Sequence, residues 1–230
     1  MVVRLIWLTA VAVGLTLAIA RLDAGGWAVV TLKDVPESVV AGKPVSLIYA
    51  VRQHGTHLTP GLQGWIEARD ARGGMVKALA TPASDTGYYL AKLTLPEAGD
   101  WTLTVHSGFM GSRSGPVPMT VVASGEQIAK LPDVERGKVL FSAKGCASCH
   151  THTAVSNPAG LGSPAGTGFA PDLTTPRYAA AYLKTFLADP SIKSPSRPGL
   201  VMPNLQLTHS EIGALVAFLA VETKQTATLR

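Results

Sequence analysis

Cysteine is scarce in this 230-residue chain, which contains only Cys146 and Cys149. No other cysteine is available for a disulfide that would link distant parts of the chain. A structural zinc site would need a second pair of ligands at matching spacing, and no second cysteine pair exists. A thioredoxin-like redox site would need a βαβ context, which the glycine- and proline-rich surroundings of these two cysteines do not provide.

Concentrated charge is also missing. The net charge is +5, and the 20 Lys and Arg residues are spread along the chain without a block of one sign. This distribution argues against a nucleic-acid-binding protein, which would cluster its basic residues. A mildly basic surface either steers docking to an acidic redox partner or simply serves solubility. No catalytic triad, carboxylate pair or phosphate-binding loop is apparent, so we do not predict an enzyme.

Long apolar runs are limited to the beginning of the chain. Residues 5–20 are uncharged and apolar, with Arg4 before them and Arg21 after them. As a helix this run is about 24 Å long, which is short of the ~30 Å hydrocarbon core of a membrane. Ala18-Ile19-Ala20 also fits a signal-peptidase site. We therefore predict that residues 1–23 are a signal peptide or a membrane anchor. The rest of the chain is then extracytoplasmic, in the periplasm or on the outer face of the cytoplasmic membrane, either anchored or secreted.

Residues 24–124 have the pattern of an all-β domain. Apolar residues alternate with others, as in Val45, Leu47, Tyr49 and Val51, and glycine- and proline-rich turns separate the segments. Trp65, Tyr89 and Trp101 are expected in the core. Seven short strands in about a hundred residues are typical of an immunoglobulin-like sandwich. The expected strands are residues 27–32, 45–51, 64–70, 75–80, 88–95, 101–106 and 117–122.

The run GYYLAKLTLPEAGDWTL at residues 87–103 resembles the FixH/YtkA-like family of β-sandwich modules. Such modules are found beside cytochrome oxidases and copper-handling proteins, so the resemblance implies an extracytoplasmic accessory domain. Copper binding by this domain is an alternative function, because histidine and methionine are soft ligands. Their spacing is not diagnostic, and an exposed loop with two solvated histidines is the other interpretation. The residues concerned are His54, His57, His106, Met75, Met110 and Met119.

The segment Cys146-Ala147-Ser148-Cys149-His150 has the attachment signature of a c-type haem. Two thiols three positions apart lie on the same side of a helical turn, where they can reach the two vinyl groups of one porphyrin. The histidine after the second thiol then lies under the iron as the proximal ligand. The motif therefore predicts one covalent haem c.

Residues 133–224 are predicted to form a helical domain, after a linker at 125–132 and before a tail at 225–230. Asp133 is the expected N-cap of a helix over 134–143, and Gly137 inside it indicates close approach of another helix. Thr175-Pro176 is expected to open a second helix over 177–188, with Leu183 and Phe186 on its apolar stripe. A capping box from Thr208 to Glu211 predicts a third helix to about residue 221.

These motifs together resemble a class I monohaem cytochrome c over residues 133–222. The resemblance implies thioethers from Cys146 and Cys149, and His150 as proximal iron ligand. It also implies that the Pro171 carbonyl orients the His150 ring and that Met202 is the distal iron ligand. Other implied features are a haem buried by Leu173, Leu183 and Phe186, and a crossing of Gly137 and Phe141 with the last helix near Phe218. The long segment between His150 and Pro171 departs from the family pattern.

The expected fold is therefore an all-β immunoglobulin-like sandwich followed by an all-α cytochrome c fold. The expected function is single-electron transfer to or from a membrane redox complex, such as a haem-copper terminal oxidase. A haem-based ligand sensor, in which Met202 leaves the iron, and a copper-handling or oxidase-assembly factor remain alternatives. His209 and His152 are the rival distal ligands, although His152 is very close to His150 in sequence.

Overall fold

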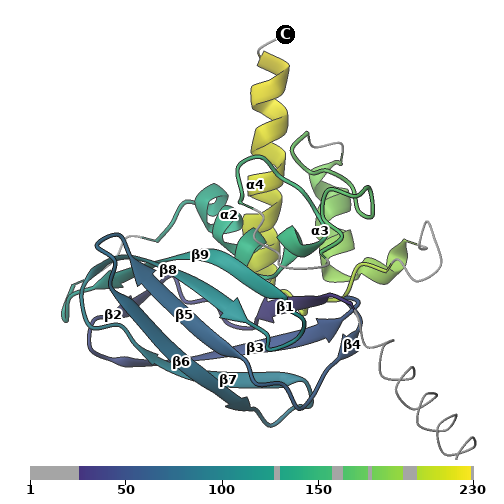
Figure 1. Cartoon of the computed structure of the whole chain (residues 1–230). Coiled ribbons are helices and arrows are strands. Elements are labelled where there is room, and N and C mark those ends of the chain that lie inside the picture. The colour runs from purple at the N-terminus through teal and green to yellow at the C-terminus, as the bar shows by residue number, and fades with distance from the viewer. Residues whose placement is uncertain (1–25, 127–129, 157–162, 176–177, 194–200, 229–230) are drawn as a thin grey trace, which may run out of the picture.

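A computed structural model describes residues 26–126, 130–156, 163–175, 178–193 and 201–228, with side chains up to Leu219. Figure 1 shows a β-sheet domain followed by a helical domain. The expected order of an all-β and an all-α part is therefore confirmed. The predicted signal or anchor at 1–23 lies outside the described residues. Within those residues, no helix has the length and apolar content needed to cross a membrane.

The β domain is a sandwich whose two sheets are joined by one shared strand. The first half of β6 pairs with β5, and its last residues, Ala80 to Pro82, pair with β7. The hydrogen-bonded order is β1-β3-β7-β6-β5-β8-β9-β2, with β4 attached to β3. The strands are β1 (Ala28–Leu32), β2 (Ser38–Val40), β3 (Pro44–Gln53), β4 (His57–Leu58), β5 (Trp65–Asp70), β6 (Met75–Pro82), β7 (Tyr88–Thr94), β8 (Gly99–His106) and β9 (Arg113–Val122).

All seven predicted strands are present. Most place alternate side chains in the core, whereas β1 buries all five of its residues. Strand β6 packs only partly buried side chains against the core, those of Val76, Ala78 and Ala80. Tyr49 on β3 and Tyr89 on β7 are buried and stack at 5.5 Å. Trp101 is also buried, as predicted. Trp65 was predicted wrongly: it lies half-exposed on the outer face, stacked at 4.4 Å on His106, its cross-strand partner. The short strands β2 and β4 were not predicted.

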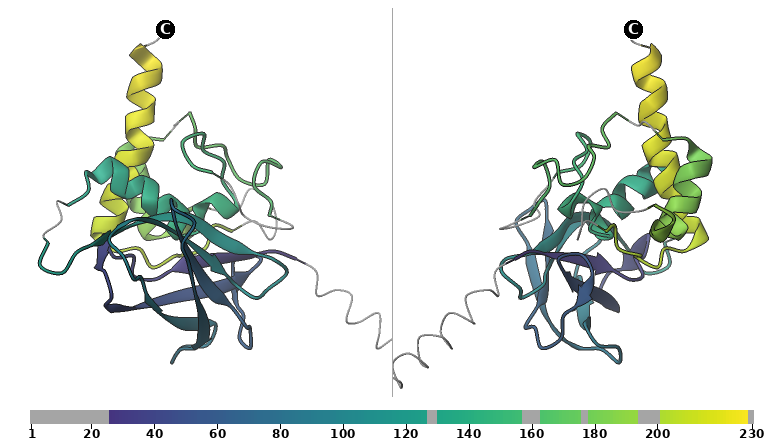
Figure 2. Two further views of the ribbon diagram at one scale, coloured as in Figure 1. Left: turned by 60° about the vertical axis from the view of Figure 1, so that its left-hand side comes forward. Right: turned by 90° about the vertical axis from the view of Figure 1, so that its right-hand side faces the viewer.

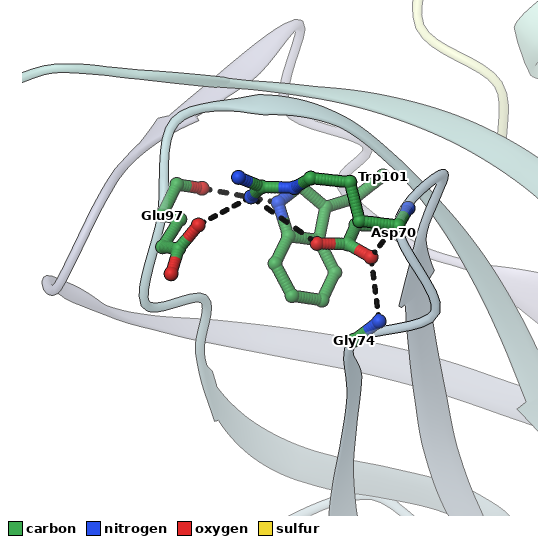
Figure 3. Close-up of polar contacts among 5 residues, drawn as sticks. Asp70, Gly74, Glu97 and Trp101 are labelled. Atoms are coloured by element: carbon green, nitrogen blue, oxygen red, sulfur yellow. Dashed lines mark hydrogen bonds and ion pairs between the residues drawn. The ribbon is translucent and has the colours of Figure 1, made fainter.

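One end of the sandwich is closed by a polar cluster where two turns meet (Figure 3). Asp70 accepts hydrogen bonds from the backbone nitrogens of Arg72, at 3.0 Å, and Gly74, at 2.6 Å. The Arg72 guanidinium also pairs with Asp70 and with Glu97. The Trp101 indole donates to the Glu97 carbonyl at 3.0 Å. The cluster ties the β5–β6 turn to the β7–β8 turn.

The helical domain contains three α-helices and two short 3-10 helices in the described residues. They are α2 (Asp133–Ala143), η2 (Cys146–Ser148), α3 (Ala180–Ala188), η3 (Pro190–Ile192) and α4 (His209–Thr228). Asp133 is the first residue of α2, so the predicted N-cap is wrong, and Pro132 takes that position without a capping side chain. The predicted start of the second helix is also wrong, because α3 begins after the extended residue Ala179. The predicted capping box is confirmed by reciprocal bonds between Thr208 and Glu211.

Helices α2 and α4 cross at Gly137, as predicted. A Cβ added to Gly137 would lie 2.1 Å from the carbonyl oxygen of Ala214 and 2.6 Å from the Cβ of Phe218. The Phe141 ring contacts Phe218 edge-on, with centroids 5.9 Å apart. A side chain at position 137 would therefore separate the two helices, which explains a glycine in a helix interior despite its helical cost.

The helical domain packs directly on the sandwich (Figures 1 and 2), where α2 lies against β9 and η2 lies near β1. Ser114 on β9 donates its hydroxyl to the Ser142 carbonyl at 2.7 Å, and Thr31 on β1 donates to the Lys144 carbonyl at 3.3 Å. The last carbonyls of a helix lack partners within the helix. Side chains of the sandwich therefore satisfy the end of α2, just before the Cys146 motif.

A buried cation completes this interface. Lys144 is 1% exposed, and its ammonium pairs with Glu211 on α4 at 2.7 Å. The same ammonium donates to the carbonyl of Lys33, just after β1. Lys144 therefore joins the sandwich, the end of α2 and the start of α4 through one charged group.

Candidate functional site

The Cys146 motif begins at a sharp turn at the end of α2. Gly145 has φ +79°, a conformation that glycine adopts without steric cost. A Cβ at this residue would lie 2.5 Å from the Val30 carbonyl oxygen of β1. The chain then forms η2, and the His150 backbone nitrogen donates to the Cys146 carbonyl at 2.9 Å. The turn therefore holds Cys146, Cys149 and His150 together, with β1 packed against its first residue.

A large cavity opens directly beside this motif. It has a volume of about 1360 Å³ with its open mouth included, and Cys146, Cys149, His150 and Met202 all line it. Ligand pockets are mostly apolar, with a few polar groups that orient the ligand. Much of the remaining lining is aromatic or aliphatic, including Phe141, Leu173, Tyr182, Leu183, Phe186, Leu187, Leu205, Leu215 and Leu219. Two thiols, an imidazole and a thioether on an apolar wall fit a covalently attached haem.

His150 is oriented by a backbone carbonyl. Its Nδ1 lies 2.9 Å from the carbonyl oxygen of Pro171. A hydrogen on Nδ1 makes this bond and leaves the Nε2 lone pair available for a metal ion. Burial lowers the pKa of His150, against the opposing effect of the Pro171 hydrogen bond, so the neutral ring is favoured. The resemblance to cytochrome c implied the same contact between Pro171 and a proximal histidine.

The two cysteine thiols also lie in an apolar environment. Burial, with a smaller contribution from Cys149, raises the pKa of Cys146 to about 12, and burial raises the pKa of Cys149 to about 12. Without haem, both therefore remain neutral thiols at neutral pH. Such groups are poor candidates for a thiolate-based nucleophile, which needs a lowered pKa.

Met202 is half-buried and lines the same cavity as His150. Neither rival histidine belongs to the lining. His209 is exposed at the start of α4. His152 is buried between Phe141 and Phe218, at centroid distances of 5.8 and 4.5 Å, and its Nδ1 accepts a bond from the Ala154 nitrogen. Of the three candidates for the second iron ligand, Met202 is the one that lines the cavity in the described part of the chain.

Three lining residues come from the sandwich, and sequence analysis did not identify them: Trp27, Val29 and Gly55. Phe169, from the segment before Pro171, was missed as well. One signal was available in the sequence. The run AVVTL of β1 has no polar alternation, and all five of its residues are buried. A strand that is buried on both faces has a layer of protein packed on each face, so this run indicated that something covers the outer face of β1.

The possible copper ligands of the sandwich lie in different environments. In the described part of the chain, no group of three or more His, Cys, Asp and Glu side chains is placed to hold a metal ion. His57 is exposed at the start of β4, and burial lowers the pKa of His106 on β8. Met119 is buried in the core, whereas Met75 and Met110 are exposed.

A family model described as cytochrome c matches residues 134–221. Residues 134–221 form a cytochrome c domain. This domain implies haem-based electron transfer, and its Cys146/Cys149 pair implies covalent haem c. Cytochrome c domains are typically electron carriers rather than enzymes. The expectation that the helical domain resembles cytochrome c is thereby confirmed.

Comparison with solved structures finds similarity on a coarse scale. The filamin domain of Lin-41 has a TM-score of 0.36 and 15% identity. The match covers 42% of this chain and 97% of the filamin domain. An alpha-2-macroglobulin from Escherichia coli has a TM-score of 0.31 and 16% identity, covering 37% of this chain and 6% of its own. A superoxide reductase from Ignicoccus hospitalis has a TM-score of 0.27 and 18% identity. That match covers 44% of this chain and 85% of the reductase. No curated protein matches the sequence.

Proposed function

We propose that this chain is an extracytoplasmic c-type cytochrome that carries single electrons through one covalent haem. The observation that carries the proposal is the shared cavity. It brings the Cys146 and Cys149 thiols, the His150 ring and the Met202 thioether to one apolar space, inside a cytochrome c domain. Covalent haem supplies a one-electron Fe(III)/Fe(II) couple.

Each of these residues has a distinct role in the proposal. Cys146 and Cys149 anchor the porphyrin edge through thioethers. His150 binds the iron through Nε2, while the Pro171 carbonyl at 2.9 Å keeps its ring in one orientation. Met202 binds the opposite side, and its soft sulfur favours the ferrous state and a higher potential. Leu173 and Phe186 exclude water from the haem plane. With His150 and Met202 as its two iron ligands, the haem would supply a one-electron couple and leave no iron position for a substrate.

The cellular setting follows from two further features of the sequence. The apolar run at residues 5–20 serves as an export signal or membrane anchor, which places both domains outside the cytoplasm. The sandwich serves as a FixH/YtkA-like accessory module, and the partner is a membrane respiratory complex such as a haem-copper oxidase. Fractionation of cells, with haem staining of the membrane and periplasmic fractions, tests the location. Reduction or oxidation of the purified protein by isolated oxidase-containing membranes tests the partner.

The ligand set is tested with a redox-titrated absorption spectrum of the purified full chain. We expect one covalent haem per chain, a single one-electron wave and a weak charge-transfer band of methionine-ligated iron in the oxidised form. Met202→Ala should remove that band and lower the midpoint potential. Met75→Ala is the control, because Met75 is exposed on β6 and far in sequence from the domain that carries the motif.

A spectrum in which Met202→Ala retains the band would overturn the ligand assignment. A chain that matures without covalent haem, although the haem-attachment machinery is present, would overturn the function itself. Cys149→Ala, which removes one thioether, should change the haem spectrum in denaturing pyridine and so verifies that attachment uses both thiols.

A further inference from the structure

The sandwich contributes directly to the wall of the haem cavity. Trp27, Val29 and Gly55 line the cavity together with Cys146 and Phe169 of the cytochrome c domain. Trp27 directly precedes β1, Val29 is the second residue of that strand, and Gly55 belongs to the turn between β3 and β4. One side of the cavity is therefore formed by a different domain from the one that holds the iron ligands.

Trp27 is held in place from both sides. On the sandwich side, its carbonyl accepts a bond from the His54 nitrogen at 3.0 Å, and its indole lies against Gly55. The His54 ring meets the indole at a centroid distance of 6.1 Å. On the cytochrome side, Phe169 contacts the indole edge-on at 5.5 Å and 86°. A large side chain packed between two domains in this way has little freedom to leave the cavity wall.

The position of this wall relative to the haem motif is also fixed. Gly145, which immediately precedes Cys146, packs on the Val30 carbonyl of β1 without room for a Cβ. Thr31 of the same strand donates its hydroxyl to the Lys144 carbonyl. Strand β1 is therefore joined to the residues before Cys146 by a backbone contact and a hydrogen bond, and Trp27 extends from this strand.

We propose that Trp27 is a haem-site residue supplied by the sandwich, which closes the cavity beside Cys146 against water and raises the midpoint potential. This inference rests on the proposed function. Ferric haem carries one more positive charge than ferrous haem, so water at its edge stabilises the ferric state. The hydrophobic shell around a metal site controls solvent access and hence its potential. The sandwich thereby acts on the redox couple without providing an iron ligand.

The test compares Trp27→Ala with Trp65→Ala in the full haem-loaded chain. Trp65 is the matched control, because it is a half-exposed tryptophan of the same domain, on an outer sheet face and outside the cavity lining. At a fixed ambient potential, Trp27→Ala should raise the ferric-to-ferrous ratio about tenfold, which is a downward shift of about 59 mV for a one-electron couple. Trp27→Phe should retain most of the native potential. Equal potentials for Trp27→Ala and Trp65→Ala would overturn the proposal.

A second measurement avoids any dependence on the folding of the alanine variant. Haem quenches the fluorescence of an indole that lies close to it. Trp27→Phe should therefore remove little emission from the haem-loaded protein, whereas Trp65→Phe should remove a large share. Comparable losses from the two variants would show that Trp27 is not beside the haem and would overturn the proposal. The failure of the underlying function is distinct, because it would appear as an absence of covalent haem in the unsubstituted chain.

Discussion

The two domains of this chain are stabilised in different ways. The sandwich fills its own interior with alternating side chains from paired strands, such as the stacked Tyr49 and Tyr89. The cytochrome c domain instead arranges helices α2, α3 and α4, and the long segments between them, around an open cavity. Sandwich hydroxyls bond to carbonyls at the end of its helix α2. The difference indicates that the sandwich folds on its own contacts, whereas the cytochrome c domain depends on its haem and on its neighbour.

The largest expected effect comes from removing covalent haem with Cys146→Ala and Cys149→Ala together. The apolar side chains around the cavity would lose their main contact, so the cytochrome c domain should lose its protection against amide hydrogen exchange. The amides of β5 and β8 should remain protected, because their core is internal to the sandwich. Hydrogen exchange followed by mass spectrometry distinguishes the two domains. Equal loss of protection in both domains would contradict the comparison.

The helix crossing provides the next largest effect. Gly137→Ala places a methyl group 2.1 Å from the Ala214 carbonyl oxygen. We expect the cytochrome c domain to lose about 3 kcal/mol of stability, since overpacking exceeds the gain of up to about 1 kcal/mol from helix propensity. Denaturant unfolding followed by the haem absorption measures this change.

Gly213→Ala on α4 is the matched control for this variant. A Cβ at Gly213 would meet nothing within 4 Å. Gly213→Ala should therefore increase the stability of the cytochrome c domain by about 0.5 to 1 kcal/mol, because alanine favours a helix more than glycine does. If both glycine variants changed stability in the same direction, the close crossing of α2 and α4 would not be the reason for glycine at position 137.

A smaller effect is expected where the sandwich caps α2. Thr31→Val removes the hydroxyl that donates to the Lys144 carbonyl and leaves this buried carbonyl without that partner. The cytochrome c domain should lose about 1 to 2 kcal/mol, measured by the same haem-monitored unfolding. Thr102→Val is the control, because Thr102 is exposed on β8. Similar losses from both variants would show that the capping bond does not couple the domains.

The smallest effect is expected at the polar cluster shown in Figure 3, which belongs to the sandwich alone. Desolvation alone would raise the pKa of Asp70, but hydrogen bonds from Gly74 and Arg72 outweigh it. The pKa of Asp70 is therefore below its ordinary value of 3.8. A lowered folded-state pKa stabilises the protein above pH 3.8, and this contribution is lost as pH falls through the folded pKa. Asp70→Asn should therefore reduce the melting temperature slightly at neutral pH, with a difference that disappears in acid. An undiminished difference at acid pH would exclude the carboxylate as its cause.

The sequence was most informative where structure follows a local period. Runs of β-branched and aromatic residues, several of them alternating, predicted the seven longer strands. The motif from Thr208 to Glu211 predicted the start of α4. It was least informative where a contact joins distant residues. The bonds from Thr31 and Ser114 to the end of α2 join residues 113 and 28 positions apart. No periodicity in the chain encodes these bonds.

The errors in prediction have specific physical reasons. Trp65 was assigned to the core because of its size, but the pleat places it on the outer face beside His106. Thr175-Pro176 predicted a helix from residue 177, because proline is common in a first helical turn, yet the helix begins only at Ala180. The motif residues of the site were found because their chemistry is local. Trp27 was missed because its role depends on the packing of two domains.

The most direct test of the central account is the response of the reduced, purified full chain to carbon monoxide. With His150 and Met202 on opposite sides of the iron, no coordination position is open. We therefore predict that the ferrous spectrum does not change at neutral pH, and that Met202→Ala makes carbon monoxide binding rapid. Rapid binding by the unsubstituted chain would contradict the electron-carrier account and would favour a haem-based ligand sensor.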